Sequence, residues 1–143
     1  MSYYSKILLH IVLMIGFLIF TISGIIIARY YKMKNSNWLK FHKTLMISGL
    51  VSGITGIAWI VFVIQIDSGM HLTISHHILG FIAALFVIGT MVLGFKLMSP
   101  NTDNSNKSVL RKIHKFEGRL SLLLIIVSAF SGLLFFGIIP LPF

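Results

Sequence analysis

The chain has 143 residues, 57% of them hydrophobic and 10% charged, and its mean hydropathy is +0.96, which excludes a soluble globular domain. It contains no cysteine, which excludes disulfides, thiolate metal sites and iron–sulfur clusters. Twelve Lys and Arg against three acidic residues give a net charge of +9, which we attribute to membrane topology and not to a nucleic-acid partner.

Four apolar segments are each long enough to cross a bilayer as a helix, which takes about 20 residues. In chain order, we predict helices at about residues 7–31, 41–66, 72–98 and 112–139. The polar stretch from Ser99 to Ser108 is rich in turn formers and predicts a solvated linker. Short connections make neighbouring helices antiparallel. We therefore predict an all-α membrane protein, an up-down bundle of four transmembrane helices that forms one domain over residues 1–143.

The basic residues gather in two of the three connections. They are Arg29, Lys32, Lys34, Lys40 and Lys43 around the first connection and Lys96, Lys107, Arg111, Lys112, Lys115 and Arg119 around the third. Only Lys6 lies near the opposite ends of the helices. By the positive-inside rule, the connections 32–40 and 99–111 are predicted to be cytoplasmic, and both termini and the turn near residues 67–71 external. We expect a multi-pass integral membrane protein in contact with lipid.

Every predicted helix carries a histidine near its first end, and intramembrane histidines usually mark function. Offsets of 4, 7, 11, 14 and 18 follow one face of a helix, and small residues recur on the face below each histidine. Below His76 the face holds Gly80, Ala83, Val87, Thr90 and Gly94, and below His114 it holds Gly118, Ser121, Ile125, Ser128 and Gly132. The face below His77 is bulky, with Phe81, Ala84, Ile88, Met91 and Phe95. Small residues alone only allow close helix packing, whereas small residues below a histidine indicate a flat ligand.

These stripes predict two haem groups, each held by two histidines. In an up-down bundle, helices one and three share one diagonal and helices two and four the other, with axes about 12–14 Å apart. His10 and His76 share the external level, and His42 and His114 share the cytoplasmic level. We attribute small residues further along each helix to clearance for the haem at the opposite level: Gly24, Ala28, Thr90 and Gly94 at the cytoplasmic level, and Gly53, Gly56, Ser128 and Gly132 at the external level. Two histidines leave no open iron position, which favours electron transfer over oxygen activation.

Four short motifs at these positions resemble the haem core of the cytochrome b561 superfamily, as found attached to extracellular DOMON domains. The motifs are IIIARYYK, WLKFH, HHILG and HKFEGR, and the resemblance covers about residues 10–135. It implies two haem b groups, shared by the first and third and by the second and fourth helices. It also implies electron transfer from cytoplasmic ascorbate to an external acceptor such as ferric chelate or monodehydroascorbate. The chain departs from the family in having Ile11 after His10, where Gly is frequent, and Lys112 and Ile113 before His114.

By their motif positions, Arg29 and Arg119 are predicted to bind haem propionates or an anionic donor. Gly80 and Gly118 are predicted to give a porphyrin room one turn from His76 and His114. His71 and His77 are expected to be interfacial residues and not ligands.

The function we predict is that of a transmembrane oxidoreductase, such as a ferric-chelate reductase, or of an electron carrier. Its donor would be an ascorbate- or quinol-like small molecule on the cytoplasmic side, and its acceptor an external compound such as ferric iron. The short chain leaves room for a homodimer or a redox partner subunit. Two alternatives stay open, a haem-b membrane anchor subunit of a quinone-linked oxidoreductase and a non-redox membrane scaffold.

Overall fold

A computed structural model of the chain describes residues 3–67 and 75–135. Within these residues the secondary structure is helical, and four helices are long and apolar enough to cross a membrane. The spanning segments are Ile7–Tyr31, Trp38–Val63, His76–Met98 and Asn104–Leu134. The prediction of an all-α membrane protein with four spanning helices is therefore confirmed. Most of the predicted external turn, with His71, lies outside the described residues, as do the chain termini and the predicted helical residues 72–74 and 136–139.

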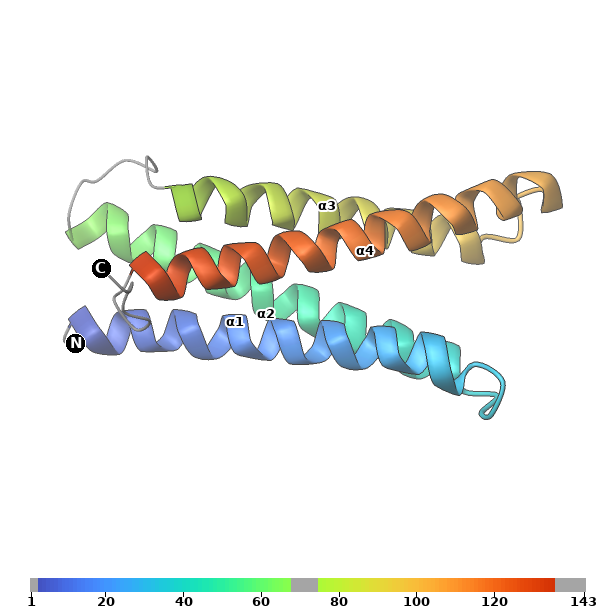
Figure 1. Ribbon diagram of the computed structural model, residues 1–143, viewed down its shortest axis with the longest axis horizontal. Helices are drawn as coiled ribbons and strands as arrows, with labels where there is room; N and C mark the ends of the chain where they lie inside the picture. Colours follow the sequence, from blue (N-terminus) through green and yellow to red (C-terminus); the bar gives the residue numbers. More distant parts are fainter. Residues whose placement is uncertain (1–2, 68–74, 136–143) are drawn as a thin grey trace. The chain divides into compact units, whose positions relative to one another are not determined.

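The first hairpin consists of α1 (Tyr3–Ile26) and α2 (Trp38–Asp67), which run antiparallel (Figure 1). The last turn of the predicted first helix is a π-helix, η1 (Ile27–Tyr31), which leads into a loop of residues 32–37. The Tyr31 carbonyl accepts hydrogen bonds from the N–H groups of Lys34 and Asn35, each at 3.0 Å. The Asn35 side chain in turn accepts one from the Asn37 N–H at 2.8 Å. These bonds satisfy the end of η1 and turn the chain back into α2.

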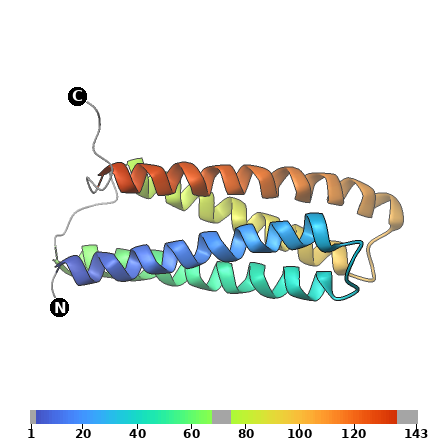
Figure 2. The same ribbon diagram turned by 60° about the horizontal axis from the view of Figure 1, so that its bottom comes forward.

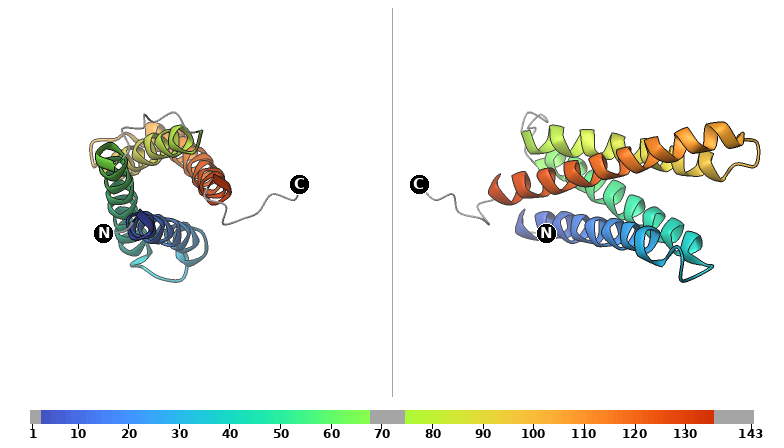
Figure 3. Two further views of the ribbon diagram at one scale, coloured as in Figure 1. Left: turned by 90° about the vertical axis from the view of Figure 1, so that its left-hand side faces the viewer. Right: turned by 45° about the vertical axis from the view of Figure 1, so that its right-hand side comes forward.

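The second hairpin consists of α3 (Ser75–Met98) and α4 (Asn104–Phe135), again antiparallel (Figures 2 and 3). The predicted linker from Ser99 to Ser108 is present but shorter than predicted, because α4 begins at Asn104, well before the predicted residue 112. The Asp103 carbonyl accepts the first helical hydrogen bond, from Lys107 N–H at 2.9 Å. Polar residues are favoured at helix starts, so the composition that indicated a linker instead builds the first turn of α4. The true connection is confined to residues 99–103.

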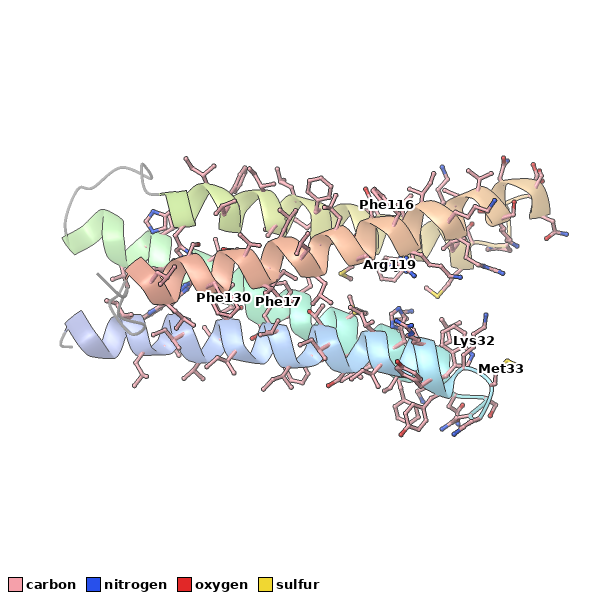
Figure 4. All side chains as sticks on the ribbon, in the orientation of Figure 1. Phe17, Lys32, Met33, Phe116, Arg119 and Phe130 are labelled. Atoms are coloured by element: carbon pink, nitrogen blue, oxygen red, sulfur yellow. The ribbon has the colours of Figure 1, made fainter. Side chains whose placement is uncertain are left out.

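Residue contacts divide the chain into two compact units, Met1–His71 and Leu72–Phe143, so each hairpin is a unit of its own. The single domain over residues 1–143 stays a prediction. Within each hairpin the connecting loop lies at the end that carries the basic residues. Figure 4 shows two labelled residues, Lys32 and Met33, at this end of the α1–α2 hairpin. The hairpins thus share one charge polarity, with Lys6 the basic residue at the other end of α1.

Candidate functional site

The residues below each histidine form the buried face of each helix, as the offsets predict. On α3, Ala83, Val87 and Thr90 are each 4% exposed or less, and on α4 the matching residues Ser121, Ile125 and Ser128 are each 4% exposed. The face below His77 is open by contrast, with Phe81 62% and Phe95 45% exposed. In the first hairpin, Phe17, Thr21, Gly24, Gly49, Gly53 and Gly56 are buried in the same way.

In the first hairpin each histidine is hydrogen-bonded to a main-chain carbonyl of the opposite helix. His10 Nδ1 lies 2.9 Å from the carbonyl oxygen of Gly56 on α2. His42 Nδ1 lies 2.9 Å from the carbonyl oxygen of Gly24 on α1. Gly24 stands 14 positions after His10, and Gly56 stands equally far after His42, so the two bonds are reciprocal. Each helix supplies one histidine and the carbonyl that anchors the other.

The second hairpin repeats this arrangement at the same spacing. His76 Nδ1 lies 2.9 Å from the Ser128 carbonyl oxygen on α4, and His114 Nδ1 lies 3.0 Å from the Thr90 carbonyl oxygen on α3. Thr90 stands 14 positions after His76, and Ser128 stands equally far after His114. The four predicted histidines therefore share one local geometry in two separate units. This spacing corresponds to about 21 Å of helix, which sets the distance between the two histidine levels.

These bonds determine the tautomer of all four imidazoles. A carbonyl oxygen only accepts hydrogen bonds, so Nδ1 must carry the proton and donate. In a neutral imidazole the lone pair then lies on Nε2, the nitrogen that can coordinate a metal in this tautomer. An Nδ1–H bond to a carbonyl also orients the ring and raises the basicity of the ligand. In their neutral form, all four histidines would therefore offer Nε2 to a metal.

Glycines in α3 and α4 bring two of these rings against the backbone. A Cβ atom added to Gly132 would lie 2.7 Å from Cε1 of His76, and one added to Gly94 would lie 3.2 Å from Cε1 of His114. We attributed these positions to haem clearance at the opposite level, but the atoms they accommodate within the hairpin belong to the anchored imidazoles. The haem clearance at Gly94 and Gly132 stays a prediction.

Gly80 and Gly118 lie in the seam between α3 and α4. A Cβ atom on Gly80 would be 3.3 Å from Ser128 Oγ, and one on Gly118 would be 3.7 Å from Thr90 Cγ2. The first hairpin reverses the sizes, because Met14 and Met46 occupy the position four residues after each histidine and pack on Gly56 and Gly24. One small residue in each facing pair allows the helices to approach. The haem contact of Gly80 and Gly118 stays a prediction.

His77 lacks the arrangement that its neighbour has. Its Nδ1 atom is buried and has no hydrogen-bond partner among the described residues, and its ring centroid lies 5.8 Å from that of His76. His76 also has a second contact, since its Nδ1 lies 3.2 Å from Ser131 Oγ on α4.

The two predicted arginines are exposed and lie toward the loop ends of their hairpins. Arg29 belongs to the π-helix η1, with its guanidinium carbon 5.5 Å from the centre of the Tyr30 ring. Arg119 projects from α4, just over one turn after His114 (Figure 4). The Trp38 ring is near both a cation and a histidine, with Lys32 Nζ 5.7 Å and the His42 ring centroid 6.5 Å from its centre.

The donor set fits haem better than a compact metal ion. Among the described residues, no three His, Cys, Asp or Glu side chains come close enough together to hold a metal ion. Neutral imidazoles anchored through Nδ1 are suited to the axial positions of haem iron. Four spanning helices with such histidines on both hairpins are the features expected of a membrane-embedded b-type cytochrome.

Residues 9–138 match the family model described as eukaryotic cytochrome b561, and the chain belongs to that family. No curated protein and no solved structure matches the chain. The family assignment confirms the resemblance found in the motifs, and it assigns haem b and transmembrane electron transfer to this protein.

The offsets located the histidines and their faces but missed the acceptors. The acceptor is a main-chain carbonyl, which every residue has, so no residue type marks it. The one available signal is that a small residue stands 14 positions after every one of the four histidines: Gly24, Gly56, Thr90 and Ser128. Ser131 carried no signal, because its contact depends on how α4 is aligned with α3.

Proposed function

We propose that the protein carries single electrons across the membrane through two haem b groups, one held by His10 and His76 and the other by His42 and His114. The observation that supports this is the reciprocal Nδ1–carbonyl bond, made by all four histidines and repeated in both hairpins. A purely structural histidine has no need of the same tautomer and the same spacing four times. Haem iron supplies the one-electron chemistry, and the chain holds and orients the imidazoles.

The pairing follows from the position of each histidine within its own hairpin. His42 and His114 lie toward the connecting loops, whereas His10 and His76 lie toward the opposite ends. Both loop ends are rich in Lys and Arg, so the positive-inside rule puts both loops on the cytoplasmic side and both termini outside. Histidines of the same level then belong to the same haem. This assignment pairs the first helix with the third and the second with the fourth.

We further propose that electrons enter on the cytoplasmic side from an anionic donor of the ascorbate type and leave to an external acceptor such as ferric chelate. Arg29 and Arg119 are the residues we assign to haem propionates or to the donor, because both are cationic, exposed and near the level of His42 and His114. Gly80 and Gly118 would allow the porphyrin to approach α3 and α4. A small donor and acceptor are the only partners this cycle needs, although a homodimer or a redox subunit is compatible with it.

The test is the haem content and spectrum of the purified chain. Protein produced with haem available should contain two b-type haems per chain, both low-spin with two histidine ligands. A colourless preparation would overturn the redox function. A preparation with one haem per chain would retain electron transfer but overturn the two-level arrangement.

A further inference from the structure

The four anchored histidines differ in the side chain that stands at one equivalent position beside each of them. Three residues after each accepting carbonyl, nearly one turn further on, the same helix carries another side chain. At three of the four sites this side chain is large and apolar or aromatic, and at the fourth it is a hydroxyl. The residues are Ile27 at the His42 site, Trp59 at the His10 site, Leu93 at the His114 site and Ser131 at the His76 site.

The Ser131 hydroxyl contacts both the donor and the acceptor of the hydrogen bond that anchors His76. Ser131 Oγ lies 3.2 Å from His76 Nδ1 and donates its own hydrogen bond to the Ser128 carbonyl at 2.8 Å. That same carbonyl accepts from His76 Nδ1 at 2.9 Å. The Nδ1–H of His76 is therefore shared between two acceptors, and its main acceptor also accepts from the Ser131 hydroxyl. At the matching place beside the His114 anchor, Leu93 has no hydroxyl to share in the bond.

Sharing weakens the electron donation that a histidine gains from its anchor. An N–H bond to a single carbonyl gives the ring partial imidazolate character and makes it a stronger donor to ferric iron. A carbonyl that already accepts an O–H bond is a poorer acceptor for the N–H. The hydroxyl that also accepts from Nδ1 lies further away than the carbonyl, at 3.2 Å against 2.9 Å. The bond that the hydroxyl accepts from Nδ1 is therefore weaker than the part of the carbonyl bond that it replaces. The net effect of the hydroxyl is to weaken hydrogen bonding at His76 Nδ1.

We propose that Ser131 is a positioning residue that makes His76 a weaker donor than His114 and so raises the reduction potential of the iron that His76 holds. This inference rests on the proposed function, in which His76 and His114 ligate different haems. Within the α3–α4 hairpin, each of the two rings has a glycine against it and a carbonyl oxygen at Nδ1. The hydroxyl therefore gives the two sites unequal potentials and favours electron flow toward His76.

A reciprocal pair of variants tests this on the full chain. Ser131→Ala removes the hydroxyl, and Leu93→Ser introduces one at the matching position beside the His114 anchor. Both positions are half-buried, and Ser131→Thr is the control that keeps the hydroxyl. The readouts are redox titration of each haem by its absorption spectrum and low-temperature paramagnetic resonance of the ferric form, neither of which requires turnover.

Ser131→Ala should lower the potential of the His76 haem alone, by about threefold to tenfold in its reduction equilibrium constant, where tenfold is about 59 mV for one electron. Leu93→Ser should raise the potential of the His114 haem, and Ser131→Thr should stay near the starting value. Unchanged or raised potential in Ser131→Ala, with both haems bound, would overturn the role of Ser131 and leave the proposed function intact. If His76→Leu and His114→Leu each retain both haems, the ligand assignment itself fails, which separates the two outcomes.

Discussion

Replacing Gly132 with alanine should remove the His76 haem while leaving the fold in place. The added Cβ would lie 2.7 Å from Cε1, 3.0 Å from Nδ1 and 3.2 Å from Nε2 of the imidazole. Ordinary contacts begin at 3.4 Å, so the ring must retreat until the 2.7 Å contact reaches that distance. If it moves directly away from α4 by this amount, the bond from Nδ1 to the Ser128 carbonyl lengthens to about 3.6 Å, which is no longer a hydrogen bond.

For the stability of α4, the favourable and unfavourable effects of the Gly132→Ala change largely offset each other. For the position of the His76 ring they do not. Overpacking costs about 1–3 kcal/mol, and a lost hydrogen bond about 0.5–1.5 kcal/mol. Against this, alanine is favoured over glycine in a helix interior by about 0.8–1 kcal/mol. The net cost for a 32-residue helix is modest, and α4 should still form. The imidazole, in contrast, loses both its anchor and its position, so haem retention is the sensitive quantity.

The assay is haem per chain by pyridine haemochrome, with redox titration to identify the haem that remains. Gly94→Ala is the graded comparison, since its Cβ would meet His114 Cε1 at 3.2 Å, much closer to the ordinary 3.4 Å, and so displaces the ring far less. Gly89→Ala is the matched control, because its nearest contact, Glu117 Oε1, is at an ordinary 3.6 Å. We expect Gly132→Ala to lose most of one haem, Gly94→Ala to lose less, and Gly89→Ala to lose none. If Gly132→Ala keeps both haems, the argument that an added Cβ atom displaces the His76 ring is wrong.

Three further predictions concern ligation, topology and the donor side. His76→Leu should remove one haem whereas His77→Leu keeps both, as measured by haem content, and the opposite result would mean that α3 is rotated. A cysteine at Ser105 should resist an impermeant reagent added outside intact cells, and rapid labelling from outside would invert the topology. Changing Arg29 and Arg119 together to glutamine should slow reduction by an anionic donor several-fold more than by a neutral one in stopped-flow measurements, with raised salt acting like the double variant. Equal slowing by both donors would assign the arginines to structure or haem retention.

The four helices and the histidine faces could be predicted because both depend on periodicity and apolar length. The offsets from His76 and His114 identify residues that are buried, and the offsets from His77 include exposed residues such as Phe81 and Phe95. The start of α4 could not be read from hydropathy, because its first turns are polar and extend beyond the apolar run that begins at Leu120. A helix in a membrane hairpin continues as long as its hydrogen bonds are satisfied, and Asp103 provides the first of them.

The contacts of the small residues could not be predicted from one helix at a time. A small residue 14 or 18 positions below a histidine leaves space, but spacing does not say whether a porphyrin or another helix fills it. At Gly132 the space holds an imidazole ring from α3. At Gly56 it holds Leu13 and Met14 of α1. Which group fills the space depends on how the two helices are aligned. The residues on one face of one helix do not determine that alignment.

The reciprocal bonds also make the orientation of the four histidines a property of each hairpin. A slip of α4 along α3 by half a turn would displace the helices by about 2.7 Å, and neither the His76 bond to Ser128 nor the His114 bond to Thr90 could survive it. Both imidazole N–H groups would then lose these acceptors at once in an apolar medium, where an unsatisfied polar group costs several kcal/mol. Since the first hairpin has the same pair of bonds, each hairpin fixes its own register and the tautomer of both its histidines. In both hairpins, main-chain contacts thus orient the histidines that we propose as haem ligands.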